Sequence, residues 1–248
     1  MGINKRDVRF VVHHSIPKSL EGYVQECGRS GRDGRKSECI LYYTYRDRQL
    51  YDWFIVNNRQ SNKSRKNENL HALYSILQYC EEPFICRRKL QLNFLGEEFN
   101  PHKCAQMCDN CKRALKVVQK DVTDEAAQIA RLIRDMTELG GNITLAQLVE
   151  ICRGKMPKAK QLKDHVVERY KGCLKVFKEN ELRRTVLQML SIKILKESFT
   201  AVRLPHGTMN ISVYLQLGRH CDDFLKVRGN VTKVTISDGV EPNDLSME

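Results

Sequence analysis

The sequence predicts a mixed α/β protein in three parts: an α/β fragment of a larger lobe, an α-helical zinc-binding hairpin and an α+β winged-helix domain. A strand–helix–strand pattern within the first 45 residues predicts the lobe fragment. Four closely spaced cysteines between positions 86 and 111 predict the metal site. Helical periodicity followed by two strand-like runs, between positions 121 and 217, predicts the winged helix.

Composition narrows the class of protein. The chain has 248 residues, a formal net charge of +12 and ten cysteines. The positive charge favours an anionic partner such as nucleic acid. No run of about 18 apolar residues occurs, so no membrane partner is expected, and no secretory leader pattern opens the chain. Ten cysteines without such a leader indicate metal ligands or free thiols in a reducing compartment.

The first segment, residues 1–58, has the pattern of a β-α-β unit. The run "DVRFVVHHSIP" predicts a strand, Ser19 precedes a short helix that Gly28 ends, and "SECILYYT" predicts a second strand. Parallel strands of this type are normally buried on both faces of a larger sheet. Because two strands and one helix cannot build that sheet, we expect the segment to be the end of an α/β domain whose remainder is missing.

A glycine-arginine loop, "GRSGRDG" at residues 28–34, follows the helix of this unit. Glycine lets a backbone approach a ligand closely, and arginine binds phosphate well. The loop does not match the Walker A pattern, because five residues separate Gly28 from Gly34 and Arg35 replaces the lysine. The alternative is that these arginines are ordinary solvated charges.

A second apparent nucleotide motif, "TDEAAQ" at residues 123–128, resembles a DEAD box. It opens a helical pattern and no apolar strand precedes it. Asp124 and Glu125 are therefore interpreted as first-turn acids that complement the helix dipole. No true nucleotide-binding loop is recognised in the chain, so the chain alone is expected to hydrolyse no ATP.

The second segment, residues 59–118, is predicted to be a helical hairpin. The polar run at 61–69 predicts a loop, and the apolar spacing within 69–82 predicts an amphipathic helix that Pro83 ends. A second helix is expected to begin at Cys86 in "CRRKLQLNFLGEEF" and to be closed near Gly96.

Four cysteines organise this segment: Cys86, Cys104, Cys108 and Cys111. Four thiolates with no histidine or water position form a closed, structural type of zinc site. An iron–sulfur cluster or unbound buried thiols are the alternatives, and Cys80, six residues before Cys86, is a rival ligand. The other cysteines are interpreted as ordinary thiols.

The third segment, residues 119–225, has the parts of a winged helix. Helices are predicted at 121–139, 144–152 and 179–197, and two strands follow at 198–204 and 210–217. Residues 226–248 are interpreted as a mobile tail.

A basic stretch lies between the second and third of these helices. Residues 152–178 contain nine lysines and arginines against two acids. A solvated basic face is the simple explanation, and a phosphate-binding surface is the sharper one. Lysines mostly contact phosphate, so little sequence preference is expected. The proposed contacts are Arg153, Lys155, Lys158, Lys160 and Lys163.

Several motifs resemble the RecQ DNA helicases, particularly the Bloom type. "GINKRDVRFVVHHSIP" and "QECGRSGRDG" are similar to helicase motifs V and VI at the end of the second, RecA-like motor lobe. "CRRKL" with the later cysteines is similar to the RecQ zinc-binding subdomain, and "YLQLG" to the RecQ C-terminal domain. The resemblance covers residues 1 to about 225.

The resemblance implies roles for individual residues. Arg32 would be an arginine finger that reaches the γ-phosphate of ATP, supported by Arg29 and Gln25. The ligand before the arginine pair would be Cys86, rather than Cys80. The tip of the wing, with His206, would separate strands or be a plain β-turn. Residues 154–160 depart from the family's usual Gly-Ser-basic run, so the DNA contacts there are less closely defined.

The resemblance also implies a function. Such helicases unwind duplex, forked or junction DNA in the 3′–5′ direction during replication, recombination and repair in the nucleus, with recombination and repair proteins as partners. ATP and Mg²⁺ would bind only in the complete helicase, with zinc structural. This chain would be the C-terminal part, with Met1 either a true start or an internal methionine. The alternatives are a non-catalytic DNA-binding or partner-binding module and, against motif VI, a zinc-bearing transcription factor.

Overall fold

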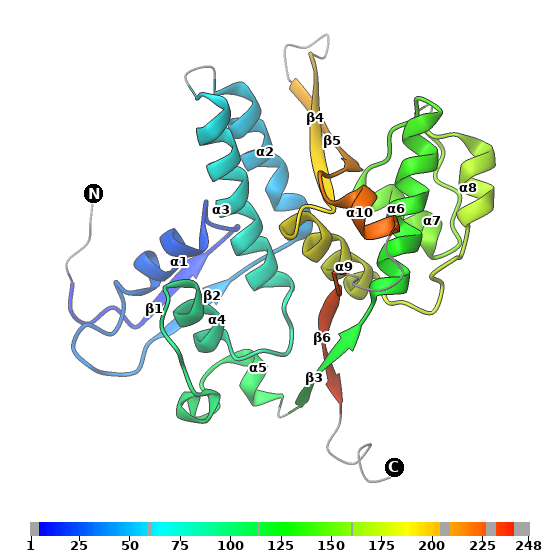
Figure 1. The fold of residues 1–248 in the computed structure, drawn as a ribbon. Coiled ribbons are helices and arrows are strands. Elements are labelled where there is room, and N and C mark those ends of the chain that lie inside the picture. The colour runs from blue at the N-terminus through cyan, green and yellow to red at the C-terminus, as the bar shows by residue number, and fades with distance from the viewer. Residues whose placement is uncertain are drawn as a thin grey trace, which may run out of the picture. The chain divides into compact units, whose positions relative to one another are not determined.

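The computed structural model describes residues 5–58, 61–113, 115–159, 161–203, 209–226 and 232–240. These residues form two compact units (Figure 1). Unit 1 takes in the described residues up to Lys116 together with Val240, and unit 2 those from Val117 to Gly239.

Unit 1 begins with the predicted β-α-β arrangement. Strands β1 (Phe10–His13) and β2 (Glu38–Leu41) pair in parallel, and helix α1 (Leu20–Cys27) connects them. The Ser19 side chain caps α1, because its Oγ accepts a hydrogen bond from the N–H of Gly22 at 3.0 Å.

One face of this two-stranded sheet is bare. Phe10 is 67% exposed, Val12 49% and Ile40 39%. Val12 and Ile40 lie opposite each other in the register, so they share that face. The opposite face bears His13, whose Nε2 lies 2.7 Å from Glu26 of α1. Helix α1 therefore covers only one side of the strands.

The core of unit 1 is built on a long helix, α3 (Lys63–Glu81), against which α1 and α2 (Arg48–Asn57) pack. A 3₁₀ turn, η1 (Tyr45–Asp47), precedes α2. Leu73, Ile76 and Leu77 of α3 are at most 1% exposed.

Two expectations fail in this region. The loop expected at 61–69 is wrong, because α3 starts at Lys63 and the Asn62 side chain caps it by accepting from the N–H of Arg65 at 2.9 Å. Helix α2 was not predicted at all. Its polar and apolar residues show no clear helical period. Two of its charged residues, Arg48 and Asp52, form an ion pair inside the unit.

The cysteine-rich part of unit 1 consists of short elements. Helix α4 (Arg87–Phe94), the 3₁₀ turn η2 (Pro101–Cys104) and helix α5 (Asp109–Lys112) follow α3. The second predicted helix is confirmed, because α4 ends just before Gly96, which takes a positive φ of 85°.

Unit 2 is built around four helices: α6 (Thr123–Glu138), α7 (Leu145–Cys152), α8 (Asp164–Tyr170) and α9 (Glu179–Ser191). The predicted apolar stripe of α6 is buried, and Asp124 and Glu125 lie in its first turn as expected. Thr144 caps α7 with a capping box that includes Gln147. Helix α8 was missed, because it is only seven residues long and lies inside the basic stretch.

Helix α9 ends earlier than the predicted residue 197. Lys193 takes a left-handed φ of 63°. The N–H of Ile194 then donates to the Met189 carbonyl at 3.0 Å and that of Lys193 to Leu190 at 3.2 Å. This is the Schellman pattern, which closes a helix without glycine at some backbone cost.

The wing is an antiparallel hairpin of β4 (Leu195–Arg203) and β5 (Met209–Leu217), in register from Leu195↔Leu217 to Arg203↔Met209. Ile143, in the turn between α6 and α7, bridges Leu215 and joins the helices to the hairpin. The tip, with His206, lies outside the described residues.

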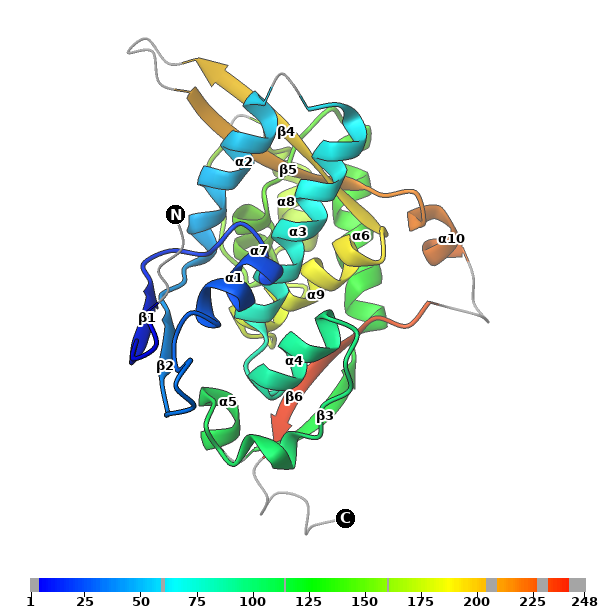
Figure 2. The ribbon, with the colours of Figure 1, turned by 90° about the vertical axis from the view of Figure 1, so that its left-hand side faces the viewer.

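The tail expected from residue 226 is corrected in part. After α10 (Cys221–Lys226), strand β6 (Thr235–Val240) pairs with β3 (Lys116–Asp121), as Figure 2 shows. Val234 is fully buried and Ile236 is 4% exposed. Arg184 of α9 donates to the Ser237 carbonyl. The strand was not predicted, because its alternation of apolar and polar residues at 234–237 is short and an acidic sequence follows it.

Among the described residues, no helix combines the length and the apolar character that crossing a membrane requires.

Candidate metal centre and nucleic-acid interface

The structure brings the four predicted cysteines together. The Sγ atoms of Cys86, Cys104, Cys108 and Cys111 all lie within 4.8 Å of one another. A tetrahedral zinc ion with Zn–S bonds of about 2.3 Å has S···S edges of about 3.8 Å. Cys80 is not a member of this cluster.

Short elements position the four sulfurs. Cys86 stands at the start of α4, Cys104 ends η2, and Cys108 caps α5. Two consecutive residues after Cys104, Ala105 and Gln106, take positive φ values of 48° and 56°. The chain thereby reverses between the second and third ligands.

The environment of the thiols suits a metal that binds thiolate. Burial raises the pKa of Cys86 and of Cys111. Burial acts in the same direction on Cys108, but its pKa is lowered on balance because the backbone N–H groups of Cys111 and Arg87 donate to its sulfur. A bound cation would stabilise the deprotonated form of these sulfurs, which burial alone disfavours. Four sulfurs with no other donor fit a closed structural zinc site.

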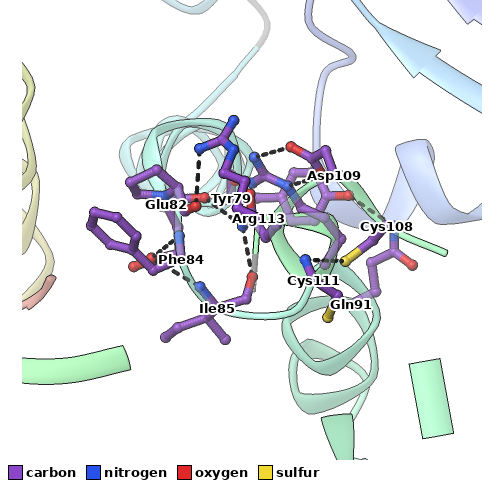
Figure 3. A network of polar contacts seen from close by, with 12 residues as sticks. Tyr79, Glu82, Phe84, Ile85, Gln91, Cys108, Asp109, Cys111 and Arg113 are labelled. Atoms are coloured by element: carbon purple, nitrogen blue, oxygen red, sulfur yellow. Dashed lines mark hydrogen bonds and ion pairs between the residues drawn. The ribbon is translucent and has the colours of Figure 1, made fainter. Parts of the chain in front are cut away.

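A polar network surrounds the segment that carries the four cysteines, residues 86–111, which we call the cysteine loop (Figure 3). Arg87, the residue after the first ligand, forms a two-pronged ion pair with Asp109, with both N···O distances at 3.0 Å. Arg87 also donates to the Tyr79 carbonyl and lies over the Tyr79 ring, 5.1 Å from its centre. This pair joins the start of α4 to the start of α5.

Asn110, between the last two ligands, and Arg113, after the last one, extend the network. The Asn110 side chain donates to the carbonyls of Glu82 at 3.0 Å and Ile85 at 2.7 Å. Arg113 donates to the carbonyl of Pro83 at 3.2 Å. The segment before Cys86 is thereby tied to α5. These residues were not predicted, although the polar Asp-Asn pair inside Cys-x-x-Cys is a signal for a supporting network.

The glycine-arginine loop has a well-defined backbone. Gly31 has a φ of 66°, and its N–H donates to the Val8 carbonyl at 3.0 Å. A side chain at Gly31 would approach the Arg35 carbonyl to 2.9 Å. Asp33 binds Arg9 at 2.6 Å, so the loop is held against the residues before β1.

The three expected catalytic residues lie on or beside this loop. Gln25 is exposed on α1, Arg29 is half-buried and Arg32 is exposed. The described part of unit 1 thus presents two arginines around a glycine turn at the end of α1, which is an arrangement that suits an anion.

The basic stretch includes helix α8 together with the residues on either side of it. Arg153, Lys155 and Lys158 are exposed and Lys163 is half-buried, while Lys160 lies outside the described residues. Arg153 has a carboxylate neighbour in Glu179 at 3.8 Å, and Arg169 in Asp135 at 3.0 Å. Among the described residues, Arg153 and Arg169 each pair with a carboxylate, whereas neither Lys155 nor Lys158 forms an ion pair. They are therefore the charges that a phosphate could neutralise with least competition.

Comparison with known proteins identifies the family. The RecQ zinc-binding family matches residues 45–112, and the RQC domain family matches residues 116–242, half of the chain. The chain belongs to the RecQ family. All four clustered cysteines lie in the first match, and the basic stretch and hairpin lie in the second.

Three individual relatives support this family assignment. The chain is 38% identical to ATP-dependent DNA helicase Q-like 4B of Arabidopsis thaliana over 79% of its length and 18% of the relative's. It is 34% identical to ATP-dependent helicase SGS1 of Saccharomyces cerevisiae over 79% of its length and 14% of the relative's. It is 31% identical to ATP-dependent DNA helicase Q-like 2 of Arabidopsis thaliana over 96% of its length and 30% of the relative's. The chain thus spans less than a third of each of these RecQ helicases and corresponds to their C-terminal region.

Proposed function

We propose that this chain is the zinc-bearing, DNA-binding part of an ATP-dependent 3′–5′ DNA helicase that unwinds duplex, forked or junction DNA in replication, recombination and repair in the nucleus. The observation that carries the proposal is the order of its parts. A four-thiol cluster lies immediately before a winged-helix unit with a basic stretch. The zinc site would hold the cysteine-rich segment of unit 1 in place, and the winged helix would supply the surface for DNA.

The bare sheet face supports the assignment of the first segment to a motor lobe. Phe10 and Val12 of β1 and Ile40 of β2 are exposed apolar side chains on parallel strands. Parallel sheets are normally covered on both faces. We infer that further strands and helices of a RecA-like lobe complete this sheet in the working enzyme.

In that enzyme, the glycine-arginine loop would face ATP held by the other lobe. Arg32 would stabilise the charge that develops on the γ-phosphate, with Arg29 and Gln25 as supporting residues. The Mg²⁺ would be held with ATP outside this chain. An arginine in this role contributes roughly 10³ to 10⁵ in rate.

The winged-helix unit would hold the DNA through phosphates. Arg153, Lys155, Lys158, Lys160 and Lys163 are the proposed contacts. His206 at the wing tip would lie where the strands separate. Lysine-rich contacts would give affinity with little sequence preference.

The alternative function is a non-catalytic DNA-binding or partner-binding module, and the observation that favours it is the lack of any Walker A pattern in the 248 residues. DNA-stimulated ATP hydrolysis decides between the two, when it is measured on the protein isolated in the form in which its source cells produce it. The helicase proposal expects hydrolysis that falls at least about 10³-fold in Arg32→Ala, while DNA affinity stays within twofold. An inactive wild-type protein that still binds DNA would favour the module instead.

A further inference from the structure

Two cysteines outside the zinc cluster lie side by side in unit 2. The Sγ atoms of Cys152 and Cys173 are 3.9 Å apart. Cys152 ends α7 and is fully buried, whereas Cys173 lies in the turn after α8 and is partly accessible. Both residues belong to unit 2 and neither is near a zinc ligand in sequence.

The backbone already holds the two residues in register. The N–H of Gly172 donates to the Ile151 carbonyl at 2.8 Å, and that of Leu174 donates to the Cys152 carbonyl at 3.0 Å. These two bonds flank Cys173 on both sides. A disulfide needs the two Cα atoms to be roughly 4.4–6.8 Å apart and the sulfurs about 2.05 Å apart. To form the bond, the two sulfurs would have to move from 3.9 Å to about 2.05 Å apart.

Two glycines provide the turns at the ends of this segment. Gly154 and Gly172 take positive φ values of 92° and 75°. A Cβ at Gly154 would lie 3.8 Å from the Gly172 Cα. The chain therefore leaves the cysteine pair and returns to it through two tight turns, and the residues in between form a closed loop.

The surroundings of Cys173 suit a reactive thiol. Lys171 and Lys175 stand two residues away on each side, and both are exposed. The pKa of Cys173 is lowered, chiefly by its hydrogen bond with Cys152 and, against the opposing effect of burial, by the backbone N–H groups of Cys173 and Leu174. The pKa of Cys152 is raised by the same hydrogen bond and by burial. Partly accessible thiols in electropositive surroundings are those that oxidants attack first.

We propose that Cys152 and Cys173 form a reversible disulfide that closes the base of the basic loop, defined as residues 153–171. The basic loop carries the lysines assigned above to DNA and the whole of α8. Its two ends are joined by hydrogen bonds in the reduced protein and by a covalent bond in the oxidised protein. Forming the disulfide would thereby restrict the conformational freedom of this loop, and reducing it would restore that freedom.

The chemistry balances with a peroxide as the oxidant. The Cys173 thiolate attacks one oxygen of hydrogen peroxide, the O–O bond breaks, and the hydroxide that leaves takes a proton to become water. The sulfur of Cys152, after losing its proton, attacks the resulting sulfenic acid. The S–O bond breaks and a second water leaves. Two thiols are oxidised by two electrons, and a small dithiol such as dithiothreitol returns them by exchange.

The test is peptide mapping of the zinc-loaded 248-residue chain after one equivalent of hydrogen peroxide, with zinc content measured before and after. The expected result is a linked pair of peptides containing Cys152 and Cys173, lost in Cys173→Ser and kept in Cys27→Ser/Cys39→Ser. The last variant is the matched control, because Cys39 Sγ lies 3.9 Å from the Cys27 carbonyl and offers another pair.

Two physical readouts accompany the mapping. The ring closed by the bond contains about 20 residues, so the midpoint of thermal unfolding is expected to rise by at least about 5 °C and to return with dithiothreitol. Amide hydrogen exchange should slow within the basic loop and not in α6. Oxidation that links other cysteines, or that leaves Cys152 and Cys173 free, would overturn the proposal. So would a linked form that unfolds at a lower temperature than the reduced one.

Discussion

At the scale of single residues, the cysteine loop shows how much depends on side chains that are not ligands. Arg87 and Asn110 make four of the contacts that hold α4, α5 and the segment before Cys86 together. Each is next to a cysteine in sequence. The ligand positions are therefore fixed by neighbours that a motif treats as variable.

The choice between Cys86 and Cys80 can be tested by substitution. Cys86→Ser should lose the single zinc ion per chain and expose the cysteine loop to protease, because structural zinc supplies on the order of 10 kcal/mol of folding free energy in small modules. Cys80→Ser should keep the ion, since Cys80 lies outside the cluster. Elemental analysis and limited proteolysis measure both effects. Full zinc in Cys86→Ser would rule out the ligand set.

A buried ion pair gives a second prediction at this scale. Arg48 and Asp52, one turn apart in α2, are joined at 3.0 Å and their side chains are 4% and 1% exposed. Arg48→Ala removes the two guanidinium N–H donors that Arg48 gives to the buried Asp52 carboxylate and should lower the free energy of unfolding by about 3–5 kcal/mol. The double variant Arg48→Met/Asp52→Leu should be much closer to wild type. Denaturant titration compares them, and equal losses in both variants would contradict the argument.

At the scale of elements, the end of the wing depends on Gly218. A Cβ at this position would lie 2.2 Å from the Lys193 carbonyl oxygen and 2.9 Å from the Ile194 carbonyl carbon. These are backbone atoms at the Schellman end of α9 and cannot move aside cheaply. The Tyr-x-x-Leu-Gly pattern thus has a packing reason.

Gly218→Ala is accordingly expected to destabilise unit 2 by more than about 3 kcal/mol, in the range of overpacked or strained sites. Gly140→Ala is the matched control, because Gly140 has a φ of 70° but open space around its Cβ position. It should cost only the left-handed backbone term, about 1–2 kcal/mol. Thermal unfolding of both variants separates steric clash from backbone strain. Equal effects would show that the clash relaxes.

Glu181 joins two elements and makes stability depend on pH. It accepts from Lys120 of β3 at 2.8 Å and from the N–H of Lys178 at 2.7 Å. Burial raises its pKa, but these donors outweigh burial, so the pKa is lowered in the folded state. Its contribution is therefore present above the unfolded pKa of about 4.3 and is lost as the pH falls through the folded pKa.

Glu181→Gln should then lower the free energy of unfolding by about 1–2 kcal/mol at pH 7. The difference from wild type should shrink as the pH falls below about 4. Denaturant titrations at several pH values provide the measurement. A difference that is constant with pH would mean that Glu181 acts through packing rather than charge.

The elements also show which parts of the fold are readable from sequence. The β-α-β unit, α6, α7, the hairpin and the cysteine cluster have strong local signals: caps, apolar stripes, alternation and ligand spacing. The missed parts depend on distant partners. Residues 63–69 are polar, and they are helical because they continue into the buried part of α3. The residues of β6 form a strand because they pair with β3 and because Arg184 donates a hydrogen bond to the Ser237 carbonyl. Helix α8 has two buried valines, which are too few to show a period.

At the scale of the whole molecule, charge is unevenly distributed along the chain. Residues 152–178 carry nine of the 42 lysines and arginines but only two of the 30 acids. Two of these arginines are already paired with carboxylates within unit 2. The charge available for DNA is therefore carried mainly by lysines, which bind phosphate without reading sequence.

The salt dependence of DNA binding tests this directly. If about four of the lysines and arginines touch phosphates, log K for duplex DNA should fall with log salt at a slope near −3.6. Replacing Lys155, Lys158, Lys160 and Lys163 with alanine should flatten this slope and weaken binding to all duplexes alike. Because each lost phosphate contact is worth about 0.9 in slope, the smaller variant Lys155→Ala/Lys158→Ala should show about half of the change. The control Lys226→Ala/Lys233→Ala removes two exposed lysines elsewhere in unit 2 and should leave the slope unchanged. Titration of labelled duplexes at several salt concentrations gives the slopes. Equal slopes in the wild type and the quadruple variant would move the DNA surface away from the basic loop.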